Sequence, residues 1–285
     1  MLDSTLLDFV MEERNKSAPG RDLSFVVGSE VTIRQDPWWW LVVAVAAIIV
    51  LLVMLLPVPF REIVIFARDG ILVTIVVTVT SYFLIIIVGL LGGLGRLSQN
   101  KLIFGISSLY VEIVRGIPLL VQLLGWYLAS PVIIRNLGDW LNLQPLIEYR
   151  ANPIITAIIA ITVCYGAYMS EIVRSGIQSV PKGQMEAARS LGMSHFQAMR
   201  HVVLPQAFRV ILPPMGNEFI ALLKDSSLVS VVAVGDLTRR GREFMAAHFN
   251  PIETWLMVAL LYLIMTIVAA RVVSYIEKRS KYERY

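Results

Sequence analysis

The sequence predicts an all-α integral membrane protein, and three observations carry this prediction. Of its 285 residues, 56% are hydrophobic and 16% are charged, whereas soluble domains contain roughly 45–50% apolar and about 25% charged residues. The mean hydropathy is +0.69. The apolar residues also lie in long blocks, and several blocks reach the ~20 residues that a helix needs to cross a bilayer.

Six apolar segments are expected to span the membrane. The first follows a mixed, polar stretch without a cleavable signal pattern, and its tryptophans suit the aromatic belt of a membrane interface. The expected spans are Trp38–Pro57, Ile71–Leu94, Leu102–Ala129, Pro153–Val173, Val210–Val234 and Ile252–Val273.

The distribution of Lys and Arg predicts the orientation. If the N-terminus faces the cytoplasm, the inner segments hold sixteen of these residues and the outer loops hold seven. Cytoplasmic loops carry an excess of positive charge. Both termini are therefore expected inside, together with the segment 184–208 between the fourth and fifth spans.

Two of the expected spans contain residues that interrupt a helix. Gly116 and Pro118 should break or kink the third span, because proline lacks a donor and clashes with the preceding turn. Pro213, Pro214 and Gly216 disrupt the first part of the fifth span. Irregular backbone at membrane depth is tolerated where it lines a cavity or packs inside protein.

Opposite charges recur at a spacing of three residues. Glu112 precedes Arg115 in the third span, and Glu171 precedes Arg174 at the end of the fourth. Residues three apart are neighbours on a helix, so each pair can form a salt bridge. A structural pair near the interface and a role in a transport pathway both remain open for these four residues.

Two acids in the fifth span are the main candidates for a functional role. Glu218 and Asp225 are seven residues apart, nearly two helical turns, so they share one face of a continuous helix. Acids in a membrane require a wet cavity, a partner or a ligand. One interpretation is a structural network in which Lys224 neutralises an acid, and the other is a substrate or pathway site. The polar residues beside them are Asn217, Ser226 and Ser227.

Residues 184–208 predict two short helices joined at a glycine. Glu186 and Arg189 are spaced for an ion pair in the first helix, and Gly192 fits the position that ends it. Ser194 and Gln197 form a capping-box pattern that begins the second helix.

The second helix is expected to be amphipathic. Such a helix can lie on lipid or dock into a protein groove, and the pattern alone does not choose between them. Its apolar face is Phe196, Met199 and Val203, and Leu204–Pro205 is expected to end it.

The same segment resembles the EAA motif of ABC-importer permeases. The motif reads E-A-A-x3-G-x9-I-x-L-P, and here it is carried by Glu186-Ala187-Ala188, Gly192 and Leu204–Pro205, with Val202 in place of isoleucine. The stretches YVEIVRGIPLLVQLL, YGAYMSEIVRSGI and LPPMGNEFIALLKDSSLVSVV are similar to the polar amino acid permeases of the histidine, glutamine and arginine importer type.

The resemblance implies the domain organisation. It covers roughly residues 70–277 and implies a five-helix type I ABC-importer core, to which the first span is an addition. The expected divisions are a cytoplasmic segment at 1–37, the extra helix and a loop at 38–69, the transmembrane domain at 70–277 and a cytoplasmic tail at 278–285. The loop expected at 131–152 is longer than usual for the family.

The resemblance also implies a mechanism and a set of partners. The chain would be a multi-pass permease subunit of an ATP-driven amino acid importer in the bacterial inner membrane, working as a homo- or heterodimer. A cytoplasmic ATPase would carry ATP and Mg, and an extracytoplasmic binding protein would deliver the amino acid. The residues implied for ATPase coupling are Glu186, Ala187, Ala188, Arg189 and Gly192; those implied near the substrate are Glu218, Asp225, Asn217, Ser226 and Ser227.

Other function classes fit the sequence less well. The chain has no Gly-Lys pair and hence no phosphate-binding loop of the G-x4-GK[ST] type. Its three histidines lie outside the spans in no metal-binding pattern, and Cys164 is a lone cysteine in an apolar run. An enzyme and a metal site are therefore not expected. A secondary transporter or channel driven by an ion gradient is the alternative, because broken spans and membrane acids fit it too.

Overall fold

A computed structural model describes residues 38–282, with side chains from 39 to 279. The predicted segment 1–37 and the last residues of the predicted tail lie outside the described part. The chain divides into two units, 1–41 and 42–285, and the second contains every contact discussed below.

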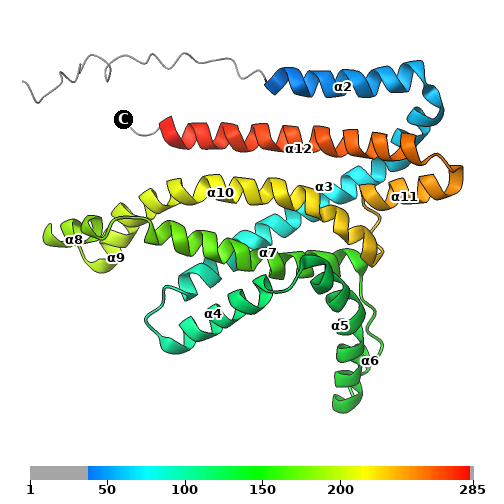
Figure 1. Ribbon diagram of the computed structural model, residues 1–285. Helices are drawn as coiled ribbons and strands as arrows, with labels where there is room; N and C mark the ends of the chain where they lie inside the picture. The colour runs from blue at the N-terminus through cyan, green and yellow to red at the C-terminus, as the bar shows by residue number, and fades with distance from the viewer. Residues whose placement is uncertain (1–37, 283–285) are drawn as a thin grey trace, which may run out of the picture. The chain divides into compact units, whose positions relative to one another are not determined.

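The regular elements of the described part are all helical. They are α2 (Trp38–Leu55), α3 (Pro57–Gly95), α4 (Lys101–Arg115), α5 (Leu119–Leu141), α6 (Gln144–Ile147), α7 (Pro153–Gln178), α8 (Lys182–Ser190), α9 (His195–Ala198), the π-helix η2 (Met199–Val203), α10 (Leu204–Asp225), the 3-10 helix η3 (Ser226–Val232), α11 (Leu237–His248) and α12 (Pro251–Tyr282) (Figure 1).

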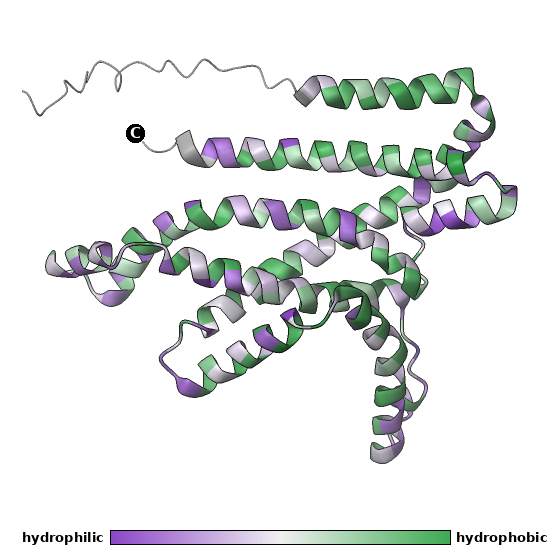
Figure 2. Ribbon diagram, in the orientation of Figure 1, coloured by the Kyte–Doolittle hydropathy of each residue, from purple (hydrophilic) through white to green (hydrophobic). Residues whose placement is uncertain are grey.

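The predicted class of helical membrane protein is confirmed. Within the described residues, four helices are long and apolar enough to cross a membrane: α3, α5, α7 and α12. The first expected span is α2, a shorter apolar helix, and the fifth is α10 followed by η3. Hydrophobic residues dominate α2 and α12, whereas α8 and α11 carry more polar ones (Figure 2). The loop expected after the first span is wrong, because α3 begins at Pro57 and already includes residues 58–69.

The third expected span is two helices, and the predicted break lies between them. Gly116 caps the end of α4, and Pro118 caps the start of α5. The Gln122 side chain donates to the carbonyl oxygens of Val114 and Ile117 at 2.8 and 2.9 Å. At the break, these two carbonyl oxygens lose their usual helical donors, and the Gln122 side chain takes the place of those donors. Irregular backbone at membrane depth is tolerated when its polar groups are satisfied within the protein.

The long loop expected at 131–152 is also wrong, because most of it is helical. α5 continues to Leu141, and α6 returns beside its last turns (Figure 1). Asn142 adopts a positive φ of 52°, and the Leu143 N–H donates to the Gly138 carbonyl at 2.9 Å. This is the hydrogen bond of a Schellman-type helix end. A side chain at Gly138 would collide with Leu146 and Ile147, so the glycine permits the close return.

The core of the bundle is built around α7. Its buried residues Ile161 and Met169 pack with Val77 and Ile85 of α3 and with Leu222 of α10. Small residues allow α3 to approach closely, because side chains at Gly89 and Gly93 would collide with Met169, Ser170 and Val173.

A second contact of α3 uses the small residues Gly70 and Thr74, which lie four residues apart on one stripe of the helix. A side chain at Gly70 would meet the Asp236 carbonyl and the Arg240 side chain. Four residues later, the Thr74 hydroxyl accepts a hydrogen bond from the Leu237 N–H at 3.1 Å. The stripe therefore packs against the start of α11.

We expect Gly93→Ala to destabilise the protein by about 1–3 kcal/mol, the usual cost of adding atoms to a packed core. The new methyl carbon would lie 2.8 Å from the Ser170 carbonyl oxygen and from the Val173 side chain, so α3 and α7 would have to separate. Thermal unfolding of the purified protein measures the effect. Gly105→Ala is the matched control, because nothing lies within 4 Å of its added carbon. Equal unfolding temperatures for both variants would contradict the close-packing interpretation.

Candidate functional site

The two predicted acids line one open hollow between α7 and α10. Glu218 and Asp225 of α10 face a cavity of about 240 Å³ together with Tyr165 and Tyr168 of α7. Leu119 and Cys164 complete its wall. The seven-residue spacing brings the acids to the same side because α10 is helical from Leu204 to Asp225. The disruption expected at Pro213, Pro214 and Gly216 is therefore wrong, since α10 continues through all three residues.

Asp225 is held by a short hydrogen bond from α7. The Tyr165 hydroxyl donates to one carboxylate oxygen of Asp225 at 2.6 Å, a length typical of hydrogen bonds to charged oxygens. α10 ends at Asp225 and gives way to η3. The bond therefore fixes the acid at the point where the helix changes its geometry and leaves the second carboxylate oxygen for other partners.

The other polar residues of this segment lie outside the wall of the cavity. Ser226 is buried and donates to the Leu223 carbonyl at 2.8 Å. Asn217 and Lys224 are exposed, and Ser227 does not line the cavity. Within the described part of the chain, Lys224 forms no ion pair. The interpretation in which it neutralises an acid is wrong, because its side chain leaves the helix about 100° away from the acid face.

Sequence reasoning missed the aromatic half of the site. Tyr165 and Tyr168 are three residues apart, which places them on one face of α7. The guanidinium of Arg115 lies 5.2 Å from the ring centre of Tyr168, a cation–π distance. Cys164 is buried and accepts a hydrogen bond from Gln122 at 3.4 Å. Two tyrosines at helical spacing in an apolar run were the available signal.

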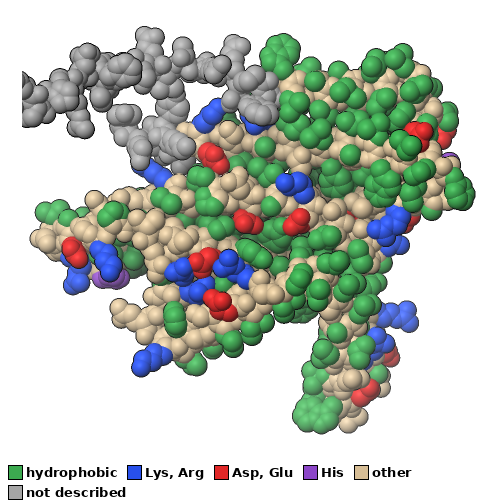
Figure 3. All heavy atoms as spheres, viewed as in Figure 1, with side chains coloured by type: hydrophobic (Ala, Val, Ile, Leu, Met, Phe, Trp, Pro, Cys, Tyr) green, Lys and Arg blue, Asp and Glu red, His purple; other side chains and the backbone are tan. Residues whose placement is uncertain are grey.

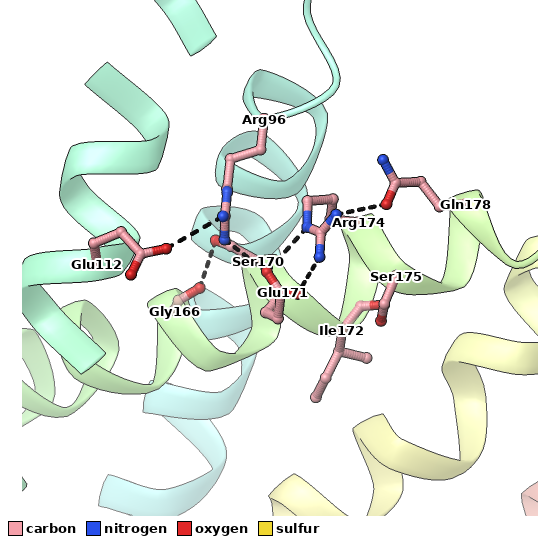
Figure 4. A network of polar contacts seen from close by, with 9 residues as sticks. All are labelled: Arg96, Glu112, Gly166, Ser170, Glu171, Ile172, Arg174, Ser175 and Gln178. Carbon is pink, nitrogen blue, oxygen red and sulfur yellow. Dashed lines mark hydrogen bonds and ion pairs between the residues drawn. The ribbon is translucent and has the colours of Figure 1, made fainter. Parts of the chain in front are cut away.

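A network of ion pairs joins three helices at one end of the bundle. Arg96 follows the end of α3 and contacts Glu171 of α7 at 2.6 Å and Glu112 of α4 at 3.4 Å (Figure 4). Arg174 binds Glu171 through two nitrogens. The predicted Glu171–Arg174 pair is thus confirmed.

The predicted Glu112–Arg115 pair is wrong. Glu112 turns to Arg96, and Arg115 covers the ring of Tyr168 instead. Arg96 lies within 3.4 Å of acids on two other helices, so the i, i+3 spacing of Glu112 and Arg115 does not decide which arginine Glu112 binds. Within residues 39–279, Arg96 therefore connects α3, α4 and α7, and Arg115 lies next to the cavity.

The EAA segment forms the two predicted helices. Gly192 has a φ of +86°, and the N–H groups of Gly192 and Met193 donate to Arg189 and Ala188 at 3.0 and 3.2 Å, which is the Schellman pattern. Ser194 and Gln197 form the predicted capping box. A left-handed residue at this point turns the chain sharply, so glycine is favoured there.

Three details of that segment differ from expectation. No ion pair joins Glu186 and Arg189 among the described residues; both side chains are exposed, where such pairs contribute little. Leu204–Pro205 does not end the second helix, because η2 continues it into α10 and proline is tolerated in the first turn. Phe196 is 71% exposed, whereas Met199 and Val203 pack against α7.

The residues proposed for coupling form an exposed surface on α8 and the turn that follows it. Glu186, Ala187, Arg189 and Gly192 are exposed, and only Ala188 faces the protein, with 4% of its surface accessible. Leu191 at the turn is 81% exposed. A short helix with this surface is accessible for docking into another protein.

Comparisons with known proteins agree with this architecture. The family model described as "Binding-protein-dependent transport system inner membrane component" matches residues 85–282. The glutamine transport system permease protein GlnP of Escherichia coli (strain K12) is 36% identical over 196 residues, which are 69% of this chain and 84% of that protein. The arginine transport system permease protein ArgU of Corynebacterium glutamicum is 40% identical over 208 residues, or 72% of this chain and 65% of that protein.

A solved structure shares the fold. It is described as the crystal structure of an amino acid ABC transporter with histidines, has 35% sequence identity and a TM-score of 0.66, and covers 77% of this chain and 96% of the other. Members of the family are transport subunits of ABC importers and not enzymes. A separate ATPase subunit uses the nucleotide, and a substrate-binding protein is the other general partner. The chain belongs to the family of binding-protein-dependent transport system inner membrane components and is a multi-pass permease subunit of an ABC importer.

Proposed function

We propose that the substrate of this permease is a polar amino acid and that Glu218 and Asp225 contact it within the membrane. The observation that carries the proposal is the cavity in which both acids meet two tyrosines. Its volume of about 240 Å³ lies below the range of about 300–1,000 Å³ for drug-sized ligands and suits a small molecule.

The chemistry of the wall matches the groups of an amino acid. The carboxylates of Glu218 and Asp225 can accept charge-assisted hydrogen bonds from an ammonium group, and the tyrosine rings can face a cation. The nearby guanidinium of Arg115 supplies positive charge for a carboxylate. Relatives named for glutamine, arginine and glutamate/aspartate transport support a polar amino acid without choosing one.

We further propose that α8 docks into the partner ATPase. The exposed residues Glu186, Ala187 and Arg189 of α8 and Gly192 in the turn after it, with Ala188 at the base, would form the coupling surface. Closure of two ATPase subunits would then move two copies of α8, on this chain and on an identical or related permease, and turn the pathway outward. In this arrangement α8 and both termini face the cytoplasm, in agreement with the excess of Lys and Arg on that side.

Reconstitution into liposomes tests the proposal. The chain should be purified with its ATPase and supplied with its binding protein, and labelled glutamine, arginine, histidine and glutamate should be offered separately. We expect at least one of them to accumulate when ATP is supplied to the ATPase, and none to accumulate when ATP or the ATPase is omitted. Uptake by the chain alone would contradict ATP-driven import. ATP-dependent uptake of none of these would contradict the proposed substrate class.

A further inference from the structure

α10 joins the two parts of the molecule to which the proposed function gives a role. It begins directly after η2, which follows α8 and α9, and it ends at Asp225 beside the cavity. Between these ends it crosses the bundle in contact with α7 and α12 (Figure 1). The α8 end is polar: Lys182, Glu186 and Arg189 are exposed there, and charged side chains mark that end in Figure 3. One helix therefore links α8 to the acids Glu218 and Asp225.

Two adjacent prolines weaken α10 between its ends. The helix continues through Pro213 and Pro214, but neither residue has a backbone N–H group. The carbonyl oxygens four positions earlier, on Arg209 and Val210, therefore lack the donor that an ordinary helix gives them. Sharp bends in helices occur mainly at prolines. α10 thus loses two backbone hydrogen bonds between the α8 segment and its first acid, Glu218.

The contacts of α10 change at the prolines. On the α8 side, Ile211 packs in a buried cluster with Val173 of α7. On the acid side, the Tyr82 hydroxyl of α3 donates to the Met215 carbonyl at 2.9 Å. The ring of Tyr82 also meets the ring of Phe219 edge-on, with 4.9 Å between the ring centres. Tyr82 therefore fixes the acid-bearing half of α10 to α3 immediately beyond the prolines.

Two hollows leave room beside the α8 half of α10. One, of about 330 Å³, is lined by Leu204 and Phe208 on the α10 side and by Ile86 and Leu90 on the α3 side. The other, of about 240 Å³, lies between α10 and α12 and reaches Leu212. A close-packed interior resists displacement, so these hollows allow the first half of α10 to tilt where a filled interior would not.

We propose that Pro213 and Pro214 form a hinge in α10, and that Tyr82 is the positioning residue that holds the acid-bearing half while the other half moves. When the ATPase subunits close and shift α8, the first half of α10 tilts about the prolines. Glu218 and Asp225 keep their places in the cavity while access to it changes, which is how transport around a fixed site works. The hinge has this use only if α8 docks the ATPase and the acids bind substrate, so the proposal rests on the proposed function.

Hydrogen exchange of the permease–ATPase complex in nanodiscs tests the hinge directly. Amide exchange should be compared without nucleotide and with ATP and vanadate, which trap the closed ATPase. We expect the exchange rates of residues 204–212 to shift and those of residues 215–225 to stay the same, because a hinge confines movement to one side. A shift that runs evenly to Asp225 would overturn the hinge and leave the coupling role of α8 intact. No shift in either half would contradict that coupling role, and the hinge with it.

Pro213→Ala with Pro214→Ala restores both N–H donors and so removes the hinge. Amino acid import per ATP hydrolysed in proteoliposomes should fall about 2- to 30-fold, the usual range for changes in the coupling between distant sites. The ATPase should still co-purify, and the unfolding temperature should not fall. The matched control is Pro131→Ala, which makes the same change inside α5 and should keep the wild-type ratio. A wild-type ratio in the double variant would overturn the proposal.

Tyr82→Phe removes only the hydroxyl and separates the role of Tyr82 from that of the prolines. Loss of this one hydrogen bond should lower import per ATP by about 2- to 10-fold. Adding the change to the double proline variant should lower the ratio no further, because residues that act together are not additive. The matched control is Tyr110→Phe, which removes a similar bond, to the Val163 carbonyl of α7 at 2.7 Å, and should keep the ratio. A wild-type ratio for Tyr82→Phe, or a fully additive loss, would overturn the role of Tyr82 in the hinge.

Discussion

Replacing Glu218 by Gln, or Asp225 by Asn, is expected to lower amino acid uptake about 10- to 100-fold at limiting substrate concentration. Each change removes a charge that would accept a hydrogen bond from the substrate ammonium, and hydrogen bonds to charged groups contribute roughly 1.5–3 kcal/mol. Asp225→Asn also weakens the 2.6 Å bond from the Tyr165 hydroxyl. Initial uptake rates in proteoliposomes containing the complete importer measure the effect.

The same substitutions at acids outside the cavity are the controls. Glu148→Gln and Asp139→Asn change exposed side chains that do not line it, and we expect uptake near the wild-type rate. All four variants should assemble with the ATPase to the same extent. Wild-type kinetics in both Glu218→Gln and Asp225→Asn would remove these acids from the pathway.

Gly192→Val is expected to reduce association with the ATPase about tenfold or more while membrane insertion stays intact. The glycine has a φ of +86°, and a β-branched residue there costs roughly 1–3 kcal/mol of backbone strain. Relief of the strain would open the Schellman turn and move α8 away from its docking position. Co-purification of the ATPase with the tagged permease measures the loss.

Gly183→Val provides the matched control for this change. Gly183 lies in α8, has no positive φ, and has nothing within 4 Å of an added carbon, so the substitution adds the same side chain without strain in the turn. A charge reversal at the exposed Glu186 should weaken docking without touching the turn. Full co-purification and transport by Gly192→Val and Glu186→Arg would show that α8 is not the coupling surface.

The sequence predicted those features that depend on near neighbours along the chain. The capping box of Ser194 and Gln197, the left-handed turn at Gly192 and the break at Gly116–Pro118 all occur as expected. Each depends on backbone hydrogen bonds and steric limits within a few residues. The common face of Glu218 and Asp225 is likewise a consequence of helical period alone.

Loop lengths were harder to predict than these local features, because a segment that mixes polar and apolar residues can still form a helix. Residues 131–141 contain Pro131, Arg135 and Asp139, yet they continue α5. Tertiary contact with α6 supports those last turns, and Gly138 makes the contact possible. Because tertiary contacts of this kind override the helix propensity of the local sequence, the sequence alone predicted a loop there.

The choice of partners was decided only by the tertiary structure. Glu112 could pair with Arg115 by local spacing, but it meets Arg96, which is 16 residues away in sequence, while Arg96 also binds Glu171, 75 residues away. Tyr165 reaches Asp225 across 60 residues. The sequence by itself determined which side of α10 carries the acids, whereas the packing of α7 against α10 decided that tyrosines face them. The physical reason is that helix geometry fixes directions within one element, and only the docking of whole helices fixes which side chains meet.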